Sequence, residues 1–363
     1  MPAAADRLSR RLTFDAAAIE THYALLAEID AVKLAMGLAP RLAPRIAARL
    51  THSMIVTSTG ASNRIEGNRL TDRDVELLYR NDTGRKLRTR DEQEVVGYFE
   101  TLELVLKSHR DMAVNESLIL QLHRDMLRYS EKDQRQRGVY KFAPNRVEAR
   151  DATGRIVGIV FDPTPPHLSP KEMRELVEWL NWADGKNFKH PLIRIANFVF
   201  EFLAIHPFQD GNGRVSRLLT NLLLLRNGYA FAALSSHESA IERQKADYYL
   251  ALRQTQTTWK SKRENIAPWV DFFLRIVRTQ AVDALRLFRS DHGADLLSQK
   301  QSDLWQWISN RNVTEFSRKE AIAALRFSPR TVEAAVKKLL DLGWLKRIGE
   351  GRATRYRRLD RSE

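Results

Sequence analysis

Apolar residues predict two buried helices near the middle of the chain, separated by a short polar loop. Residues 190–205 are apolar nearly all round, as expected of a helix enclosed by a core. After Val215, apolar residues recur at helical spacing until Asn227 and Gly228, which supply a stop signal. The segment between these two stretches is therefore a loop that joins two core helices.

The rest of the pattern predicts a mainly α fold in three regions. Residues 1–105 form an N-terminal helical region, in which Thr71-Asp72-Arg73-Asp74 resembles a capping box that opens a new helix. Residues 106–292 form a central region closed by a long amphipathic helix, which we expect to end at Ser290-Asp291-His292-Gly293. Residues 300–363 form the third domain.

A β-hairpin is expected within the central region. Between Pro144 and Pro163, two short β-rich runs flank Asp151-Ala152-Thr153-Gly154, which has the composition of a hairpin turn. Proline then ends the second run, because it cannot donate a ladder hydrogen bond.

The third domain reads as three helices followed by a hairpin. The expected helices are Ser302–Ser309, Arg318–Leu325 and Pro329–Leu342, and strands 344–348 and 354–358 flank a glycine-containing turn. This order resembles a winged helix-turn-helix domain. Such modules place the third helix, which here carries Arg330, Thr331, Lys337 and Lys338, in the major groove of DNA. Winged helices also dock proteins or form dimers, so both kinds of partner stay open.

Charge and composition narrow the class of protein. The 363 residues carry a formal net charge of +14, and residues 301–363 contribute 14 Lys or Arg against 8 Asp or Glu. A basic surface attracts nucleic acid, although it also occurs in proteins that never meet DNA. The chain has no cysteine, which excludes disulfides and thiolate chemistry. No apolar stretch reaches the length of a membrane span or a secretory signal, so we expect a cytoplasmic protein without membrane contact.

The loop between the two buried helices has the composition of an anion site. It reads His206-Pro207-Phe208-Gln209-Asp210-Gly211-Asn212-Gly213-Arg214, and Arg217 follows three residues later. Gly211 and Gly213 let the backbone adopt positive φ, so that consecutive N–H groups point at a ligand next to the positive end of a helix.

The charged residues of this loop indicate nucleotide chemistry. Arg214 and Arg217 oppose the helix dipole unless an anion sits there, and their spacing lets them clamp successive phosphates. Asp210 could hold Mg²⁺ together with phosphate oxygens, and His206 is left as a titratable base. Any one of these residues alone would be read as a core histidine, a glycine turn or a solvated arginine. Their combination favours a phosphate site.

These residues match the motif HPFx[D/N]GNGRxxR, through which the chain resembles the Fic family of AMP-transferases. The resemblance implies a Fic-type helical core in which His206 takes the proton from a Tyr, Ser or Thr hydroxyl of a protein and Asp210 binds Mg²⁺. Gly211, Asn212 and Gly213 would hold the α- and β-phosphates of ATP, Arg214 the β-phosphate and Arg217 the γ-phosphate. Phe208 would anchor the loop in the core.

A second motif lies upstream, in Ser62-Asn63-Arg64-Ile65-Glu66-Gly67. It ends a predicted helix that starts at about Pro44, with Gly67 at the position of a left-handed cap. Glu66 faces the negative end of that helix, so Glu66 and Arg217 would each gain from meeting the other. The pattern also resembles the inhibitory motif of Fic enzymes, which implies that Glu66 pairs with Arg217 and displaces the γ-phosphate. A solvated surface acid is the alternative.

The resemblance adds two further expectations. The hairpin would act as a flap that presents the target segment, by strand addition, to the base. Tyr248 and Tyr249 would lie near the adenine, although core packing explains an aromatic pair equally well. The expected function is therefore an autoinhibited protein adenylyltransferase that also modifies itself, with ATP and Mg²⁺. The alternative is a nucleotide-sensing, DNA-binding transcriptional regulator, and a homodimer stays open.

Overall fold

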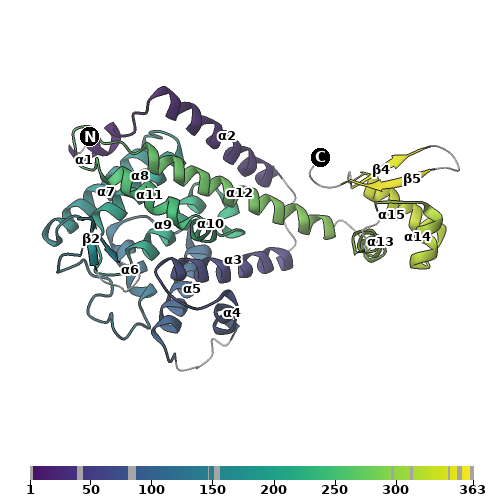
Figure 1. Cartoon of the computed structure of the whole chain (residues 1–363), viewed down its shortest axis with the longest axis horizontal. Coiled ribbons are helices and arrows are strands. Elements are labelled where there is room, and N and C mark those ends of the chain that lie inside the picture. The colour runs from purple at the N-terminus through teal and green to yellow at the C-terminus, as the bar shows by residue number, and fades with distance from the viewer. Residues whose placement is uncertain are drawn as a thin grey trace. The chain divides into compact units, whose positions relative to one another are not determined.

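The computed structural model describes residues 3–38, 44–80, 87–145, 147–150, 156–295, 298–310, 314–341, 344–349 and 354–359. The chain folds into two compact units, Met1–Leu287 and Phe288–Glu363 (Figure 1). The first unit thus contains both the N-terminal and the central region expected from the sequence.

The first unit is mainly helical and carries one small hairpin. Its helices are α1 (Ala3–Arg10), α2 (Ala16–Leu38), α3 (Pro44–Ile65), α4 (Asp72–Arg80), α5 (Arg90–Ser108), α6 (Glu116–Met126), α7 (Ser169–Gly185), α8 (Pro191–Ile205), α9 (Asn212–Arg226), α10 (His237–Arg243), α11 (Lys245–Gln256) and the larger part of α12 (Ala267–Asp295), which continues past Leu287 into the second unit, with 3-10 turns η1 (Pro166–Leu168) and η2 (Ala230–Ala233). The mainly α fold class is confirmed.

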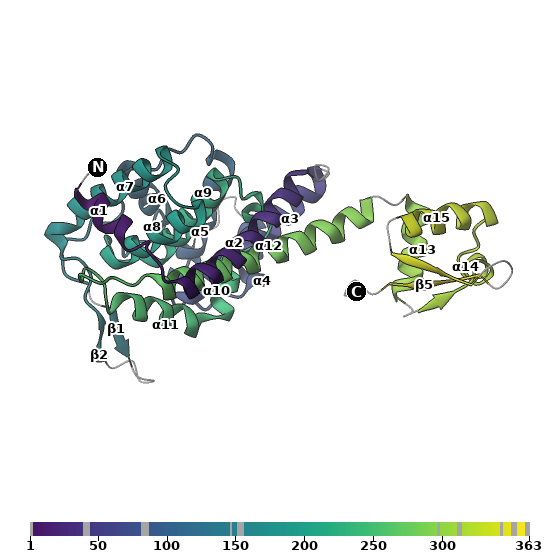
Figure 2. The ribbon, with the colours of Figure 1, turned by 90° about the horizontal axis from the view of Figure 1, so that it is seen from above.

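The hairpin consists of β1 (Val147–Arg150) and β2 (Ile156–Phe161), which pair antiparallel with Val147 opposite Phe161. Figure 2 shows both strands at the edge of the helical part of the unit. The expected turn, Asp151-Ala152-Thr153-Gly154, lies outside the described residues.

Helices α8 and α9 form the centre of the core, as their apolar pattern predicts. Every residue from Leu192 to Ile205 is buried, including the charged Arg194 and Glu201. Glu201 is paired with Arg7 and with Arg11, the latter at 2.5 Å, so that α1 is fastened onto α8. Burial alone would raise the pKa of Glu201, but the two arginines outweigh it and lower this pKa to about 2.

The end of α12 differs from the expectation. The helix continues through Gly293 to Asp295, so the predicted stop at Ser290-Asp291-His292-Gly293 is wrong. A single glycine costs a helix only about 1 kcal/mol relative to alanine, which is too little to end a long helix by itself.

The second unit has its own apolar core and a three-stranded sheet. It contains α13 (Gln299–Asn310), β3 (Glu315–Phe316), α14 (Arg318–Leu325), α15 (Pro329–Asp341), β4 (Leu345–Ile348) and β5 (Arg355–Arg358), with the strand order β3-β5-β4. Phe316, Val332 and Tyr356 are among its buried residues. The expected helices and hairpin are present, and β3 is an element that the sequence pattern did not indicate.

Candidate functional site

The loop between α8 and α9 begins at His206, whose backbone is left-handed with φ of 53°. Its Nδ1 lies 3.1 Å from the carbonyl oxygen of Leu203. Because a carbonyl only accepts, Nδ1 carries the proton and Nε2 keeps a lone pair. Burial lowers the pKa of His206 to about 4, so the imidazole is neutral at pH 7. The histidine is therefore prepared to accept a proton.

Phe208 anchors the loop, as expected. Its ring is fully buried and stacks on the ring of His123 with centroids 3.8 Å apart. The side chain of Asn212 accepts a hydrogen bond from Phe208 N at 2.9 Å and donates one to Phe208 O at 2.7 Å. This side chain therefore holds the loop, and the backbone N–H of Asn212 is available to a ligand.

Three further residues, His123, Lys141 and Asn145, hold the same loop by hydrogen bonds to its backbone and to the end of α8. His123 Nδ1 accepts from Gly138 N at 3.0 Å, so its Nε2 carries the proton that bonds the Asp210 carbonyl at 3.1 Å. Asn145 donates to Phe208 O at 2.6 Å, and Lys141 Nζ donates to Ile205 O at 3.1 Å. Burial lowers the pKa of Lys141 to about 8. The sequence carried no periodic signal for Lys141 or Asn145, because both follow a helix in an irregular segment.

The start of α9 offers N–H groups to a ligand. Gly211 caps the helix with φ of 82°, and Asp210 Oδ1 accepts from Gly211 N at 2.6 Å. The first N–H groups of an α-helix have no acceptor within the helix, which makes this end an anion site. Within the described part of the chain, no acceptor is found for the N–H groups of residues 212–214.

Gly213 does not have the positive φ that the sequence suggested, because it lies inside the first turn of α9. Its lack of a side chain matters for another reason. A Cβ at this position would lie 2.2 Å from Oε1 of Glu66 and 3.2 Å from Nη1 of Arg217. Glycine therefore leaves the room that these two side chains occupy.

Asp210 and Arg214 lie beside this helix start. Arg214 is buried, and its guanidinium lies 3.4 Å from Asp210 and 3.5 Å from Glu94. Arg90 approaches the other oxygen of Asp210 at 3.1 Å. Desolvation pulls the pKa of Asp210 upward, but Arg214, the N–H of Gly211 and Arg90 outweigh it, and the pKa is lowered. The carboxylate is ionised and 41 % exposed, as a ligand for a cation would be.

Arg217 is paired with Glu66, as the second motif predicted. Nη2 of Arg217 donates to Glu66 Oε1 at 2.8 Å, while Nε donates to Ser62 Oγ at 2.7 Å. Although desolvation raises the pKa of Glu66, the charge of Arg217 lowers it further, so the carboxylate is ionised. Gly67 has φ of 97°, which confirms the left-handed cap. The segment Ser62–Gly67 and the start of α9 therefore meet in space.

Tyr248 and Tyr249 lie on α11, and only the second is open to solvent. Tyr248 is 4 % exposed and packs against Trp269 and Phe272. Tyr249 is 44 % exposed and contacts the ring of Tyr248 edge-on. Tyr248 thus belongs to the core, and Tyr249 is the ring of this pair that a ligand can reach.

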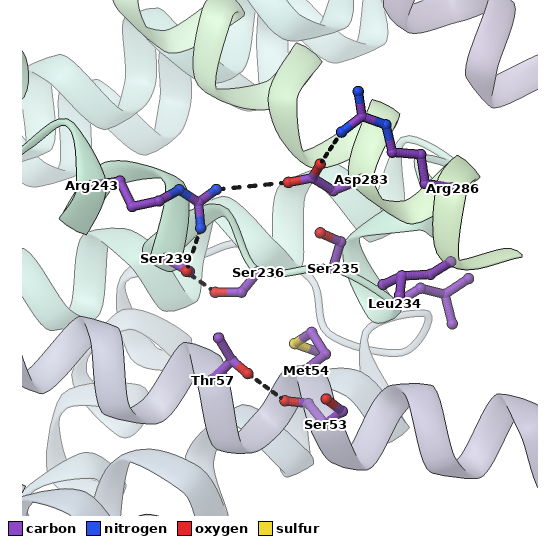
Figure 3. Close-up of a pocket in the computed structure, with 11 residues that line it drawn as sticks. Ser53, Met54, Thr57, Leu234, Ser235, Ser236, Ser239, Arg243, Asp283 and Arg286 are labelled. Atoms are coloured by element: carbon purple, nitrogen blue, oxygen red, sulfur yellow. Dashed lines mark hydrogen bonds and ion pairs between the residues drawn. The ribbon is translucent and has the colours of Figure 1, made fainter. Parts of the chain in front are cut away.

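A separate cavity of about 330 Å³ lies between α3, α10 and α12, and its lining includes Ser53, Ser239, Arg243 and Asp283 (Figure 3). None of its lining residues belongs to the loop between α8 and α9. It is therefore distinct from the candidate site.

Among the described residues, no helix combines the length and apolarity that spanning a membrane requires.

Comparison with known proteins finds a family to which the region of the site is similar. Residues 113–224 match the Fic/DOC family model. The chain is 28 % identical over 169 residues to protein adenylyltransferase fic-1 of Caenorhabditis elegans, covering 45 % of this chain and 29 % of the relative. It is 27 % identical over 175 residues to a probable protein adenylyltransferase of Aquifex aeolicus, covering 43 % of this chain and 53 % of the relative.

Solved structures extend the similarity beyond the matched segment. A Fic family protein from Desulfovibrio desulfuricans G20 superposes with a TM-score of 0.60 at 26 % identity, covering 97 % of this chain and 98 % of that one. A Fic-1 structure from C. elegans gives a TM-score of 0.58 at 19 % identity over 74 % of this chain and 73 % of that one. The second likeness concerns the fold alone.

Proposed function

Given that this chain carries a Fic domain over residues 113–224, we propose that it is a self-restrained protein adenylyltransferase. It would transfer AMP from ATP to a Tyr, Ser or Thr hydroxyl of a protein, itself included. The observation that carries this proposal is the juxtaposition of a neutral histidine, an unsatisfied helix start and an arginine held by a glutamate.

In the proposed reaction, His206 acts as the general base. The substrate hydroxyl gives its proton to Nε2 while its oxygen bonds to the α-phosphorus, and the bond from that phosphorus to the bridging oxygen of pyrophosphate breaks. Nδ1 stays bonded to Leu203 O, which keeps the ring oriented. A neutral base is what this step needs, because an imidazolium has no lone pair to accept the proton.

The start of α9 would hold the phosphates. The N–H groups of residues 212–214 and the buried guanidinium of Arg214 supply donors for oxyanions. Asp210 fits Mg²⁺ because it is an ionised, half-open carboxylate next to that anion site, and Mg²⁺ prefers one or two carboxylates plus phosphate oxygens. When bound, the cation would neutralise charge on the phosphates.

Glu66 would restrain the enzyme. By the motif, Arg217 receives the γ-phosphate, yet its Nη2 is bonded to the Glu66 carboxylate. A phosphate in the same place would meet a negative charge, so ATP would settle with its α-phosphate away from the attacking hydroxyl. The hairpin β1–β2 would present the target segment by strand addition. The chain spans about a third of the length of one curated relative and about half of the other. The substrates of those relatives are therefore not assigned to this protein.

The identity of the transferred group tests this function. Glu66→Gly and the double variant Glu66→Gly/His206→Ala are incubated with Mg²⁺ and ATP labelled at either the α- or the γ-phosphate. We expect label on protein from the α-position alone, and only when His206 is present. Label from the γ-position would instead show that the protein is a kinase. Label on protein in the variant without His206 would show that His206 is not the general base.

A second candidate function is favoured by the charges of the second unit, which we propose is a winged helix. Three of its arginines are paired with acids: Arg318 with Glu333, Arg355 with Glu320 and Arg357 with Glu315. Within the described part of this unit, Arg330 and Lys337 on α15 are exposed and have no ion-pair partner. The free positive charges of this helix can neutralise DNA phosphates. In this second function, the chain would be a DNA-binding regulator whose first unit senses a nucleotide.

A further inference from the structure

Helix α3, which ends just before Glu66, is held by three residues of the α10–α11 segment. Residues 238, 242 and 245 of that segment each bond to α3; the first two lie one turn apart on α10, and the third opens α11 after the non-helical Gln244. We refer to Glu238, Glu242 and Lys245 as the clasp. All three contacts join residues about 180 positions apart in the sequence.

The first contact of the clasp is buried. Glu238 is fully buried, and its carboxylate accepts hydrogen bonds from Ser58 on α3 at 2.8 Å and from Tyr98 on α5 at 3.1 Å. Asn221 and Ser236 supply two more donors. Desolvation would raise the pKa of Glu238, but His237, the backbone and the hydrogen bonds from Ser58 and Asn221 outweigh it, and the pKa is lowered. The middle of α3 is thereby tied to a fixed buried charge.

The other two contacts of the clasp reach the end of α3. Glu242 accepts two hydrogen bonds from Arg64, from Nε at 2.6 Å and from Nη2 at 3.0 Å. Lys245 Nζ donates to the carbonyl oxygen of Ile65 at 2.7 Å. A cation there also suits the negative end of the helix. Arg64 and Ile65 directly precede Glu66, so the clasp fixes the backbone from which the Glu66 side chain extends.

We propose that the clasp positions Glu66 against Arg217 and so sets how strongly the enzyme is restrained. This inference rests on the proposed function. Glu66 lies just beyond the last helical residue, and its carboxylate is 36 % exposed, so its own ion pair is weakened by solvent. The Glu66–Arg217 pair then depends on the helix end being held in place. Loosening the clasp releases Arg217 to the γ-phosphate.

A double-mutant cycle tests this coupling. Glu242→Gln removes one of the two carboxylates that hold Arg64, the other being that of Asp72 at 2.8 Å, and it touches neither Glu66 nor Arg217. We expect it to raise AMP incorporation roughly fivefold, as a small shift in a two-state balance does, while adding nothing in the Glu66→Gly background. Unchanged incorporation by Glu242→Gln, or an equal rise in both backgrounds, overturns the proposal.

Arg243→Gln is the matched control. Arg243 neighbours Glu242 on α10, but its guanidinium bonds to Ser239 at 2.8 Å and lies 3.7 Å from Asp283, away from α3 (Figure 3). Its loss should leave incorporation unchanged. If Arg243→Gln activates as much as Glu242→Gln, the effect is general loosening of α10 and the clasp fails.

A second readout separates the clasp from the proposed activity. Amide hydrogen exchange near residue 65 reports the opening of the end of α3 and needs no turnover. We expect faster exchange there in Glu242→Gln than in Arg243→Gln. This result would stand even if Glu66→Gly transferred no AMP. A lack of AMP transfer by Glu66→Gly would refute the proposed function but not the clasp. Identical exchange in both variants would refute the clasp.

Discussion

Arg217 and Glu66, which are 151 residues apart in sequence, form an ion pair at 2.8 Å against the first turn of α9. Ser62, one helical turn before Glu66, accepts from the same guanidinium through its hydroxyl and its carbonyl. The guanidinium is thus held at three points by Ser62 of α3 and by Glu66 just beyond its end. Gly213 provides the space for this arrangement, since a Cβ would overlap the Glu66 carboxylate.

Removing Glu66 should change how ATP stabilises the protein. Glu66→Gly leaves Arg217 with Ser62 as its partner, and we expect a loss of about 1 kcal/mol in the free energy of unfolding, because the carboxylate is 36 % exposed. ATP with Mg²⁺ should then raise the melting temperature of the variant more than that of the wild type, since the γ-phosphate takes the vacated partner. Differential scanning fluorimetry measures both. Equal shifts would mean that Glu66 does not compete with the nucleotide.

The pH dependence of AMP transfer follows from the pKa of His206. Burial lowers this pKa to about 4, and the base works only when neutral, so activity is lost as the pH falls through about 4. We expect kcat/KM of Glu66→Gly, which reports the free enzyme, to be flat from about pH 5.5 to 8. A decline centred near pH 6.5, the ordinary value for histidine, would show that the ring is solvated or is not the base.

Asn212 should affect stability and AMP transfer by holding the loop in shape rather than by binding the phosphates. Asn212→Ala removes both hydrogen bonds to the Phe208 backbone and leaves the Phe208 N–H buried without an acceptor. We expect a loss of roughly 2–3 kcal/mol in denaturant unfolding and at least a tenfold fall in AMP transfer in the Glu66→Gly background. Asn212→Asp, which keeps the acceptor for Phe208 N, should lose less of both. An alanine variant that is stable and fully active would assign the loop geometry to other residues.

DNA binding by the second unit is checked with a gel shift on a duplex of about 30 base pairs. Reversal of Lys337 and Lys338 to Glu should abolish a shift seen at 50 mM salt, and in wild type the shift should weaken steeply towards 200 mM salt. Lys107→Glu/Lys171→Glu makes the same change of charge in the first unit and should bind normally. Absence of any shift by the wild type at low salt would leave the unit as a protein-docking module.

The sequence predicted the elements that carry strong local patterns. The core helices on either side of His206 and the cap at Gly67 follow from periodicity and glycine placement, whereas the pairing of Glu66 with Arg217 is implied by the resemblance to the inhibitory motif. The contacts of Glu238 and Glu242 with α3 could not be predicted, since neither spacing nor composition encodes a pairing across 180 residues. Strand β3, with two residues, is too short for any periodicity to appear.

The central claim is that Glu66 withholds Arg217 from ATP, and the rate of AMP incorporation tests it most directly. Wild type and Glu66→Gly are compared at equal concentrations of ATP and Mg²⁺, with the protein itself as the acceptor. We predict that Glu66→Gly incorporates AMP at least tenfold faster, and that Arg217→Ala cancels the gain. Equal rates for wild type and Glu66→Gly would contradict the account.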